Sequence, residues 1–129
     1  MAQVKIYGLK THLKQIKGTL SDVIHISVVE TLAFPKEKRF HRFISFDADE
    51  MIFPDDKSEQ YTIIEIMMME GRSVETKKLL IKTLFEKIST ELHIETNDIE
   101  ICIIESPASN WGFRGLSGDE IALNYNINV

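Results

Sequence analysis

The sequence predicts an α+β fold in which two tandem βαβ units form a four-stranded mixed sheet with both helices on one face, followed by a C-terminal strand. Three observations favour it: a length of 129 residues, which suits one domain; a strand pattern before and after each of two helical stripes; and an internal offset of 60 residues. At that offset apolar residues coincide: Ile6 with Ile66, Leu20 with Leu80, Ile24 with Leu84, Val28 with Ile88, Leu32 with Leu92 and Phe34 with Ile94. We therefore expect a single domain over residues 1–129, built from pseudo-repeats at about 2–46 and 61–105.

The first unit opens with an alternating strand at Val4–Tyr7, and Gly8 begins a turn. Apolar residues then recur every three or four positions from Leu13 to Leu32, which is typical of one face of a helix. Phe34-Pro35 ends the helix, because the residue before a proline is restricted to extended conformations. Alternation over residues 40–46 predicts the second strand.

The second unit opens with a near-continuous apolar strand at Tyr61–Met69, a pattern typical of a strand covered on both faces. Gly71 makes the following turn, and Ser73 is placed to cap the next helix. Apolar spacing from Leu80 to Leu92 predicts that helix, and Ile99–Ile104 is the closing strand. A strand–helix–strand connection of this length normally joins parallel strands.

Two segments lie outside the units. Residues 47–60 are polar and acidic, and we interpret them as the connection between the units. Residues 106–129 begin with a glycine-rich loop, and their last nine residues alternate apolar with small or polar side chains. That alternation predicts a half-buried strand. Its apolar face needs a cover, for which another subunit is one candidate.

The composition excludes several classes of protein. Twenty acidic against fifteen basic residues give a net charge of −5, which disfavours nucleic acid as a partner. One cysteine, Cys102, excludes an internal disulfide, and its apolar strand suggests a core thiol. No apolar run is long enough for a membrane helix, and the first residues lack the core of a signal peptide, so a cytoplasmic protein is expected.

Arg72 is the strongest candidate for a functional residue. It lies in the turn between a predicted strand and a predicted helix. Its guanidinium could therefore bind a carboxylate through two hydrogen bonds near the helix N-terminus. A surface arginine paired with Glu70 or Glu75 is the alternative. Trp111, in a glycine-bounded loop, is either the wall of a small pocket or a packing anchor.

Several of these residues resemble the 4-oxalocrotonate tautomerase family. The resemblance lies in Glu70-Gly71-Arg72-Ser73, Lys77, Ile101–Glu105 and Asn110-Trp111-Gly112, over about 60 residues of the second unit. With the 60-residue offset, the chain is similar to the fused, double-length members of the tautomerase superfamily, such as malonate semialdehyde decarboxylase and cis-3-chloroacrylic acid dehalogenase. The resemblance implies the superfamily's fold, which macrophage migration inhibitory factor (MIF) shares, and a homotrimer.

The resemblance also implies a site and a mechanism that need no cofactor or metal. In the family an N-terminal proline acts as acid or base, arginines hold the substrate carboxylate and an aromatic residue walls the pocket. Position 2 here is Ala2, which offers a primary amine with a pKa of about 7.7–8.0 if Met1 is removed. Two specialised patterns are also missing, since Lys38 replaces the acid of the decarboxylase and Met69 the second arginine of the dehalogenase.

Two functions therefore stay open at the level of sequence. The first is an isomerase that moves a proton on a small 2-oxo or enol carboxylic acid, with Ala2 and Arg72 as catalytic residues. The second is a non-catalytic trimer that binds a small anion or a protein partner, which the missing proline favours. The candidate residues for binding the substrate are Arg72, Trp111, Arg114, Arg39 and His41.

Overall fold

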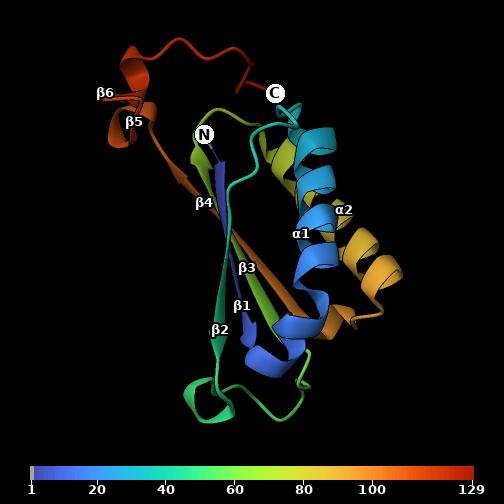
Figure 1. The fold of residues 1–129 in the computed structure, drawn as a ribbon. Helices are drawn as coiled ribbons and strands as arrows, with labels where there is room; N and C mark the ends of the chain where they lie inside the picture. Colours follow the sequence, from blue (N-terminus) through green and yellow to red (C-terminus); the bar gives the residue numbers. More distant parts are fainter. Residues whose placement is uncertain (1) are drawn as a thin grey trace.

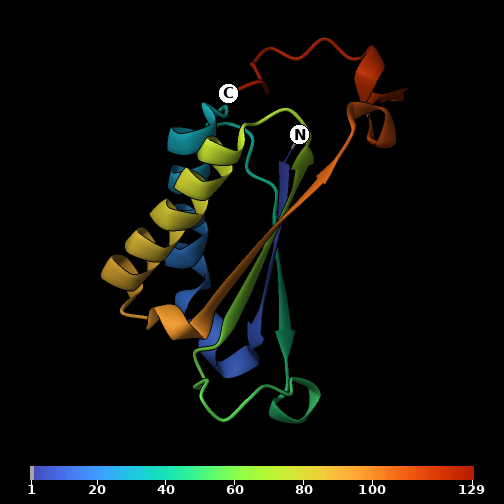
Figure 2. The same cartoon turned by 180° about the vertical axis from the view of Figure 1, so that it is seen from behind.

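The computed structural model describes residues 2–129 and contains the predicted sheet (Figure 1). Its main elements are β1 (Ala2–Leu9), α1 (Lys10–Leu32), β2 (His41–Phe46), β3 (Thr62–Met69), α2 (Val74–Leu92) and β4 (Ile99–Ser106). The strand order is β2-β1-β3-β4, with β1 parallel to β2, β3 parallel to β4, and β1 antiparallel to β3. Both helices cover the same face of the sheet, as the two opposite views show (Figures 1 and 2). The predicted fold class is confirmed.

The hydrophobic core lies between the helices and the covered face of the sheet. Side chains of β1 and β3 alternate between buried and half-buried, as the strand period of two requires. The fully buried side chains come from both strands and both helices, and they include Ile6, Leu20, Ile24, Ile64, Ile66, Leu80 and Leu84. The apolar spacing in the sequence therefore identified the core correctly.

The opposite face of the sheet is not covered by any element of the described chain. The Tyr7 hydroxyl donates to Glu65 across this face, at 2.5 Å. Cys102 is exposed on it, so the prediction of a core thiol was wrong. The long apolar run of β3 suggested two covered faces, but Ile63 and Met67 are only half-buried in the single chain.

The predicted helix boundaries are close to those observed. Helix α1 ends at Leu32, and Ala33 takes the left-handed conformation with φ of 51°. Helix α2 begins after Ser73, whose hydroxyl accepts the amide N–H of Thr76 at 3.1 Å. This cap satisfies one of the free amide groups of the first turn.

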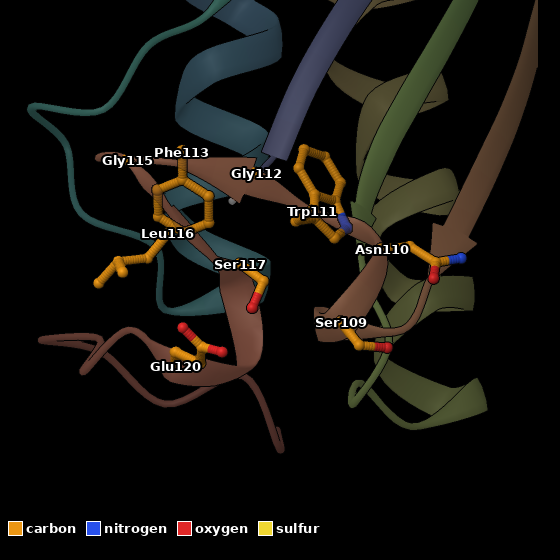
Figure 3. A pocket seen from close by; sticks show the side chains of 9 residues that line it. All are labelled: Ser109, Asn110, Trp111, Gly112, Phe113, Gly115, Leu116, Ser117 and Glu120. Carbon is orange, nitrogen blue, oxygen red and sulfur yellow. The ribbon is translucent and has the colours of Figure 1, made fainter.

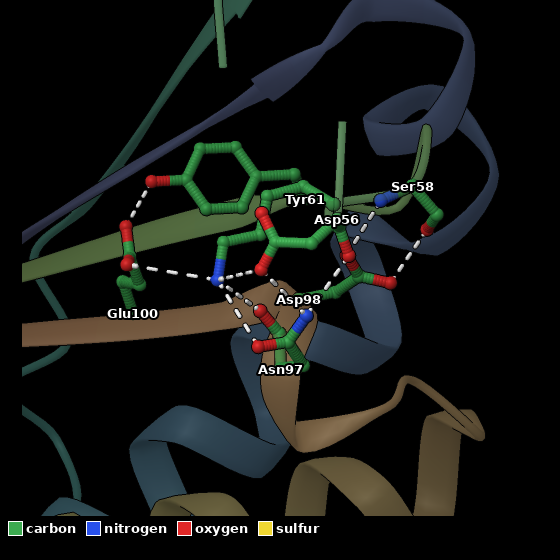
Figure 4. Close-up of polar contacts among 7 residues, drawn as sticks. Asp56, Ser58, Tyr61, Asn97, Asp98 and Glu100 are labelled. Carbon is green, nitrogen blue, oxygen red and sulfur yellow. Dashed lines mark hydrogen bonds and ion pairs between the residues drawn. The ribbon is translucent and has the colours of Figure 1, made fainter. Parts of the chain in front are cut away.

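The connecting segment 47–60 is tied to the end of the sheet where β3 begins (Figure 4). The buried carboxylate of Asp98 accepts the amide of Ser58 at 2.7 Å and its hydroxyl at 2.5 Å. Lys57 Nζ donates to the carbonyl of Asn97 at 2.8 Å, and the Tyr61 hydroxyl donates to Glu100. These contacts fix the segment far from the first residue of β1.

The segment after β4 differs from the prediction. A two-stranded hairpin forms from β5 (Gly112–Phe113) and β6 (Leu116–Ser117), whereas residues 121–129 form no strand. Exposure still alternates along residues 121–129, but they run past the ends of both helices and not along a strand edge (Figures 1 and 2). We call residues 121–129 the C-terminal strap. No helix in the described part of the chain is long and apolar enough to cross a bilayer.

Candidate functional site

The elements that carry the predicted site residues begin or end at one end of the four-stranded sheet. Strand β1 starts where β3 ends, because Ala2 pairs with Met68 in the antiparallel register. Strand β4 ends beside β3, with Ser106 opposite Met69, and β2 starts at the same end. The turn to α2 and the loop after β4 therefore both adjoin the first residue of β1. Ala2 itself is buried, and Met1 lies outside the described residues.

Arg72 is the centre of this site. Its side chain is 5% exposed, and its Nη1 donates to the carbonyl of Met69 at 3.2 Å. Within residues 2–129, its Nε and Nη2 are buried and have no hydrogen-bond partner. No ion pair joins it to Glu70 or Glu75 in that part of the chain, so the interpretation as a paired surface arginine was wrong.

The electrostatic state of Arg72 follows from its burial. Burial lowers the pKa of the guanidinium from its usual value, while the nearby Tyr125 and Glu105 oppose that shift. An arginine nevertheless stays charged in proteins. Glu105 does not neutralise it directly, because its Oε1 accepts a hydrogen bond from Lys77 Nζ at 2.7 Å. The site thus holds a buried cation with two donor nitrogens that are unpaired within residues 2–129, and a guanidinium with such donors can bind a carboxylate.

Tyr125 is a residue of this neighbourhood that the sequence did not single out. Burial raises the pKa of its phenol, and the charges of Arg72 and Arg114 lower it in part. Its ring packs against Phe34, with 5.1 Å between the ring centres, and the Lys38 ammonium lies 5.1 Å from the ring. The alternation of the strap placed Tyr125 on the apolar side, but nothing in the sequence said what that side would cover.

Trp111 walls a cavity of about 640 Å³ (Figure 3). The cavity lies in the loop after β4 and includes Phe113 and Glu120, but Arg72 does not line it. The indole Nε1 is buried and has no hydrogen-bond partner within residues 2–129. The backbone carbonyl of Trp111 accepts the amide of Gly118 at 2.7 Å, so Trp111 also anchors the loop. Both interpretations made from the sequence describe part of its role.

Arg114, Arg39 and His41 are less directly placed. Arg114 is exposed with φ of 54°, and its guanidinium lies 5.6 Å from the ring centre of Phe113. Arg39 is exposed and pairs with Asp22 at 2.6 Å. Arg39 and His41 line a separate cavity of about 350 Å³ beside the start of β1.

His41 is held in its neutral form. Burial is the main cause that lowers the pKa of its imidazole to about 4, and the neighbouring His25 and Arg39 contribute to that shift. Its Nδ1 lies 2.7 Å from the hydroxyl of Ser21. At neutral pH the side chain therefore offers hydrogen bonds but no positive charge to an anion.

The carboxylates that lie close enough to share a cation, among the described residues, are those of Asp47, Asp49 and Glu50. All three are exposed and follow the last residue of β2, at the end of the sheet opposite to Arg72. They take no part in the candidate site.

The fold and the site together define a tandem βαβ protein with a buried guanidinium at one end of its sheet. The chain belongs to the tautomerase family, since the family model described as tautomerase enzyme matches residues 38–114. A probable tautomerase of Bacillus subtilis (strain 168), YusQ, is 22% identical over 99 residues, which cover 73% of this chain and 78% of that protein. The 2-hydroxymuconate tautomerase of Comamonas testosteroni is 32% identical over 57 residues, which cover 44% of this chain and 90% of that protein.

Solved structures show the same fold over nearly the whole chain. A fused 4-OT has a TM-score of 0.82 at 18% identity, covering 92% of this chain and 98% of that chain. The FG41 malonate semialdehyde decarboxylase inhibited by 3-bromopropiolate has a TM-score of 0.80 at 24% identity, covering 94% and 98%. Another fused 4-OT, solved as an asymmetric trimer, has a TM-score of 0.79 at 19% identity, covering 92% and 97%. At these identities the likeness is one of fold.

Proposed function

We propose that the chain is a tautomerase that moves a proton on a small 2-oxo or enol carboxylic acid, with Arg72 holding the carboxylate. The observation that carries the proposal is the buried guanidinium with two donors unsatisfied within residues 2–129. A carboxylate provides two acceptor oxygens in the plane of the arginine fork, and its charge offsets the cost of burying the cation. Family membership supports the reaction class.

The acid–base group of this proposal is the amine of Ala2, exposed by removal of Met1. Ala2 is buried at the start of β1 and pairs with Met68, three residues before Gly71. A free α-amine titrates near neutral pH, and burial shifts its pKa down, so it is suited to take up the proton next to a carbonyl. Trp111 and the groups beside it would shape the pocket.

A non-catalytic anion-binding or partner-binding role is the second candidate. It is favoured by the alanine at position 2, because a primary amine replaces the family's secondary amine. Arg72 would bind an anion in either case, so binding alone does not separate the two candidates.

We also propose that the chain acts as a homotrimer. Two fused 4-OT neighbours were solved as trimers, which supports self-association. Apolar side chains on the uncovered face of the sheet also support self-association, because Ile63 and Met67 are only half-buried and Ile104 is exposed. A second and third copy would remove these side chains from water. The cytoplasmic location stays a prediction from sequence.

The test is ketonisation of 2-hydroxymuconate or of enol-phenylpyruvate by protein whose N-terminus is established by intact mass. Arg72→Ala should lower kcat/KM at least tenfold, because one charge-assisted pair contributes about 1.5–3 kcal/mol. Arg42→Ala, an exposed arginine that donates to Gln3, is the matched control. Background rates for the protein starting at Ala2 and for Ala2→Pro would exclude the enzyme and leave the binding role.

A further inference from the structure

We infer that the C-terminal strap is the closing element of the Arg72 site and docks stably only when an anion occupies the guanidinium. The inference rests on the proposed function, because it takes Arg72 as the group that binds the carboxylate. It adds a conformational step that neither the fold nor the family assignment implies.

The strap touches the chain on both sides of Arg72. The backbone amide of Ser73 donates to the carbonyl of Val129 at 2.8 Å. On the other side the strap approaches Gly71 so closely that a Cβ there would lie 2.9 Å from the carbonyl oxygen of Ile127. Gly71 has φ of 146°, which L side chains rarely adopt. The sequence thus leaves room for the strap at the turn that carries the guanidinium.

Tyr125 fastens the middle of the strap. Its ring packs edge-on against the buried Phe34, which follows the end of α1, and the Lys38 ammonium lies 5.1 Å from the ring. The partly buried ring of Tyr125 also packs against the hydrophobic core. The strap therefore bridges the end of α1 and the start of α2, as both views of the ribbon show (Figures 1 and 2).

Docking of the strap has an electrostatic consequence. With the strap in place Arg72 is 5% exposed, and its Nε and Nη2 have no acceptor within residues 2–129. Burying a cation while two of its donor nitrogens stay unpaired is unfavourable, whereas a carboxylate supplies the missing acceptors. The strap thus docks at a cost that an anion removes, and by reciprocity the docked strap strengthens anion binding.

The strap is held without strand pairing. Its residues are half-buried or exposed in alternation, and the amide of Ser73 donates to the carbonyl of its last residue, Val129. Segments outside helices and sheets whose side chains are at most half-buried open and close with smaller free energies than the core. The charge state of its surroundings can therefore decide whether it is docked.

The experiment measures hydrogen exchange of the Ser73 amide and of residues 121–129 by NMR, with and without phenylpyruvate. In the wild-type protein we expect phenylpyruvate to raise the protection at least tenfold. In Arg72→Met, which keeps the length of the side chain and removes the charge, we expect the strap to be protected without any ligand. The comparison of the two ligand-free proteins tests the coupling even if phenylpyruvate does not bind.

Two results of the exchange experiment would overturn the inference. The first is equal protection of the wild-type strap with and without phenylpyruvate, provided that Arg72→Met abolishes phenylpyruvate binding. The second is an unprotected strap in ligand-free Arg72→Met. A matched pair of strap variants adds a second measurement. Tyr125→Ala should weaken phenylpyruvate binding by calorimetry at least fivefold, and Asn124→Ala, whose side chain is exposed, should not change it. Equal affinities for the pair would also count against the inference. If Arg72→Met binds phenylpyruvate as the wild type does, the proposed function fails instead.

Discussion

Replacing Arg72 by methionine should stabilise the ligand-free protein. Two buried donors of the guanidinium have no partner within residues 2–129, and each such group costs about 1–3 kcal/mol. The replacement loses the hydrogen bond to the carbonyl of Met69, which is worth about 1 kcal/mol. A methionine of similar length fills the same space without burying a charge.

The size of the gain has an upper limit. The wild-type protein can avoid the full cost by releasing the C-terminal strap and hydrating Arg72, so the gain cannot exceed the free energy of strap docking. We expect the free energy of unfolding to rise by about 1–2 kcal/mol, which corresponds to about 4–8 °C in Tm for a chain of this length.

The assay is urea and thermal unfolding in chloride buffer without carboxylate or phosphate. Arg42→Met is the control, since Arg42 is exposed, and its free energy of unfolding should change by less than about 0.5 kcal/mol. A saturating ligand should reverse the order, because only the wild type gains from it. An Arg72→Met protein that is less stable than the wild type by more than about 1 kcal/mol would refute the reasoning, as it would make Arg72 a structural residue.

Two further predictions concern the surroundings of the site. Gly118→Ala should lower the free energy of unfolding by about 1–3 kcal/mol, because its Cβ would lie 2.5 Å from the carbonyl oxygen of Ala108, while Gly112→Ala meets nothing within 4 Å and should be nearly neutral in chemical denaturation. Burial and the nearby His25 hold the pKa of His41 at about 4 in the folded protein, so the unfolded chain, with an ordinary value near 6.5, takes up this proton first as pH falls. The free energy of unfolding should therefore drop by about 1–2 kcal/mol between pH 7 and pH 5, and His41→Gln should remove that part of the slope; an unchanged slope would contradict the assignment.

The elements of the fold were predictable because their signals are local. The spacing of apolar residues in both helices, the cap at Ser73 and the strand patterns each depend on neighbours within a few residues. The parallel pairing within each unit follows from the length of the crossover. The antiparallel pairing of β1 with β3 joins the two parallel strand pairs into one four-stranded sheet.

The parts that the sequence did not predict depend on contacts between distant segments. The strap alternates like a strand, but it lies beside no strand edge. Its contacts are instead with Phe34 after α1, with Ser73 before α2 and with the turn at Gly71. Cys102 lies in an apolar run, but apolar character does not tell which face of a sheet has a cover in the single chain. Arg72 is likewise buried in the folded chain, where Tyr125, 53 residues further along the sequence, lies near it.

The two ends of the sheet differ in a way that limits anion binding to one of them. At the 60-residue offset His12 takes the place of Arg72, and Thr62 that of Ala2. His12 and Thr62 lie together in the structure, with His12 Nε2 3.3 Å from the Thr62 hydroxyl. That hydroxyl donates to the carbonyl of Gln60 at 2.8 Å. Since that hydroxyl gives its proton to the carbonyl, the imidazole must be the donor to its oxygen.

This second end has a cavity of about 290 Å³, and no lysine or arginine is among the described residues that line it. Its lining within the described chain is His12, Thr11, Gln15, Glu59 and Gln60. Burial lowers the pKa of His12, against the opposing effect of Asp98, so the imidazole is neutral at pH 7. A carboxylate brought there would lose its hydration without meeting a cation, and Glu59 would repel it. Calorimetric titration with a 2-oxo acid should therefore give one bound anion per chain, and a stoichiometry of two would show that an uncharged, hydrogen-bonding end suffices to hold a carboxylate.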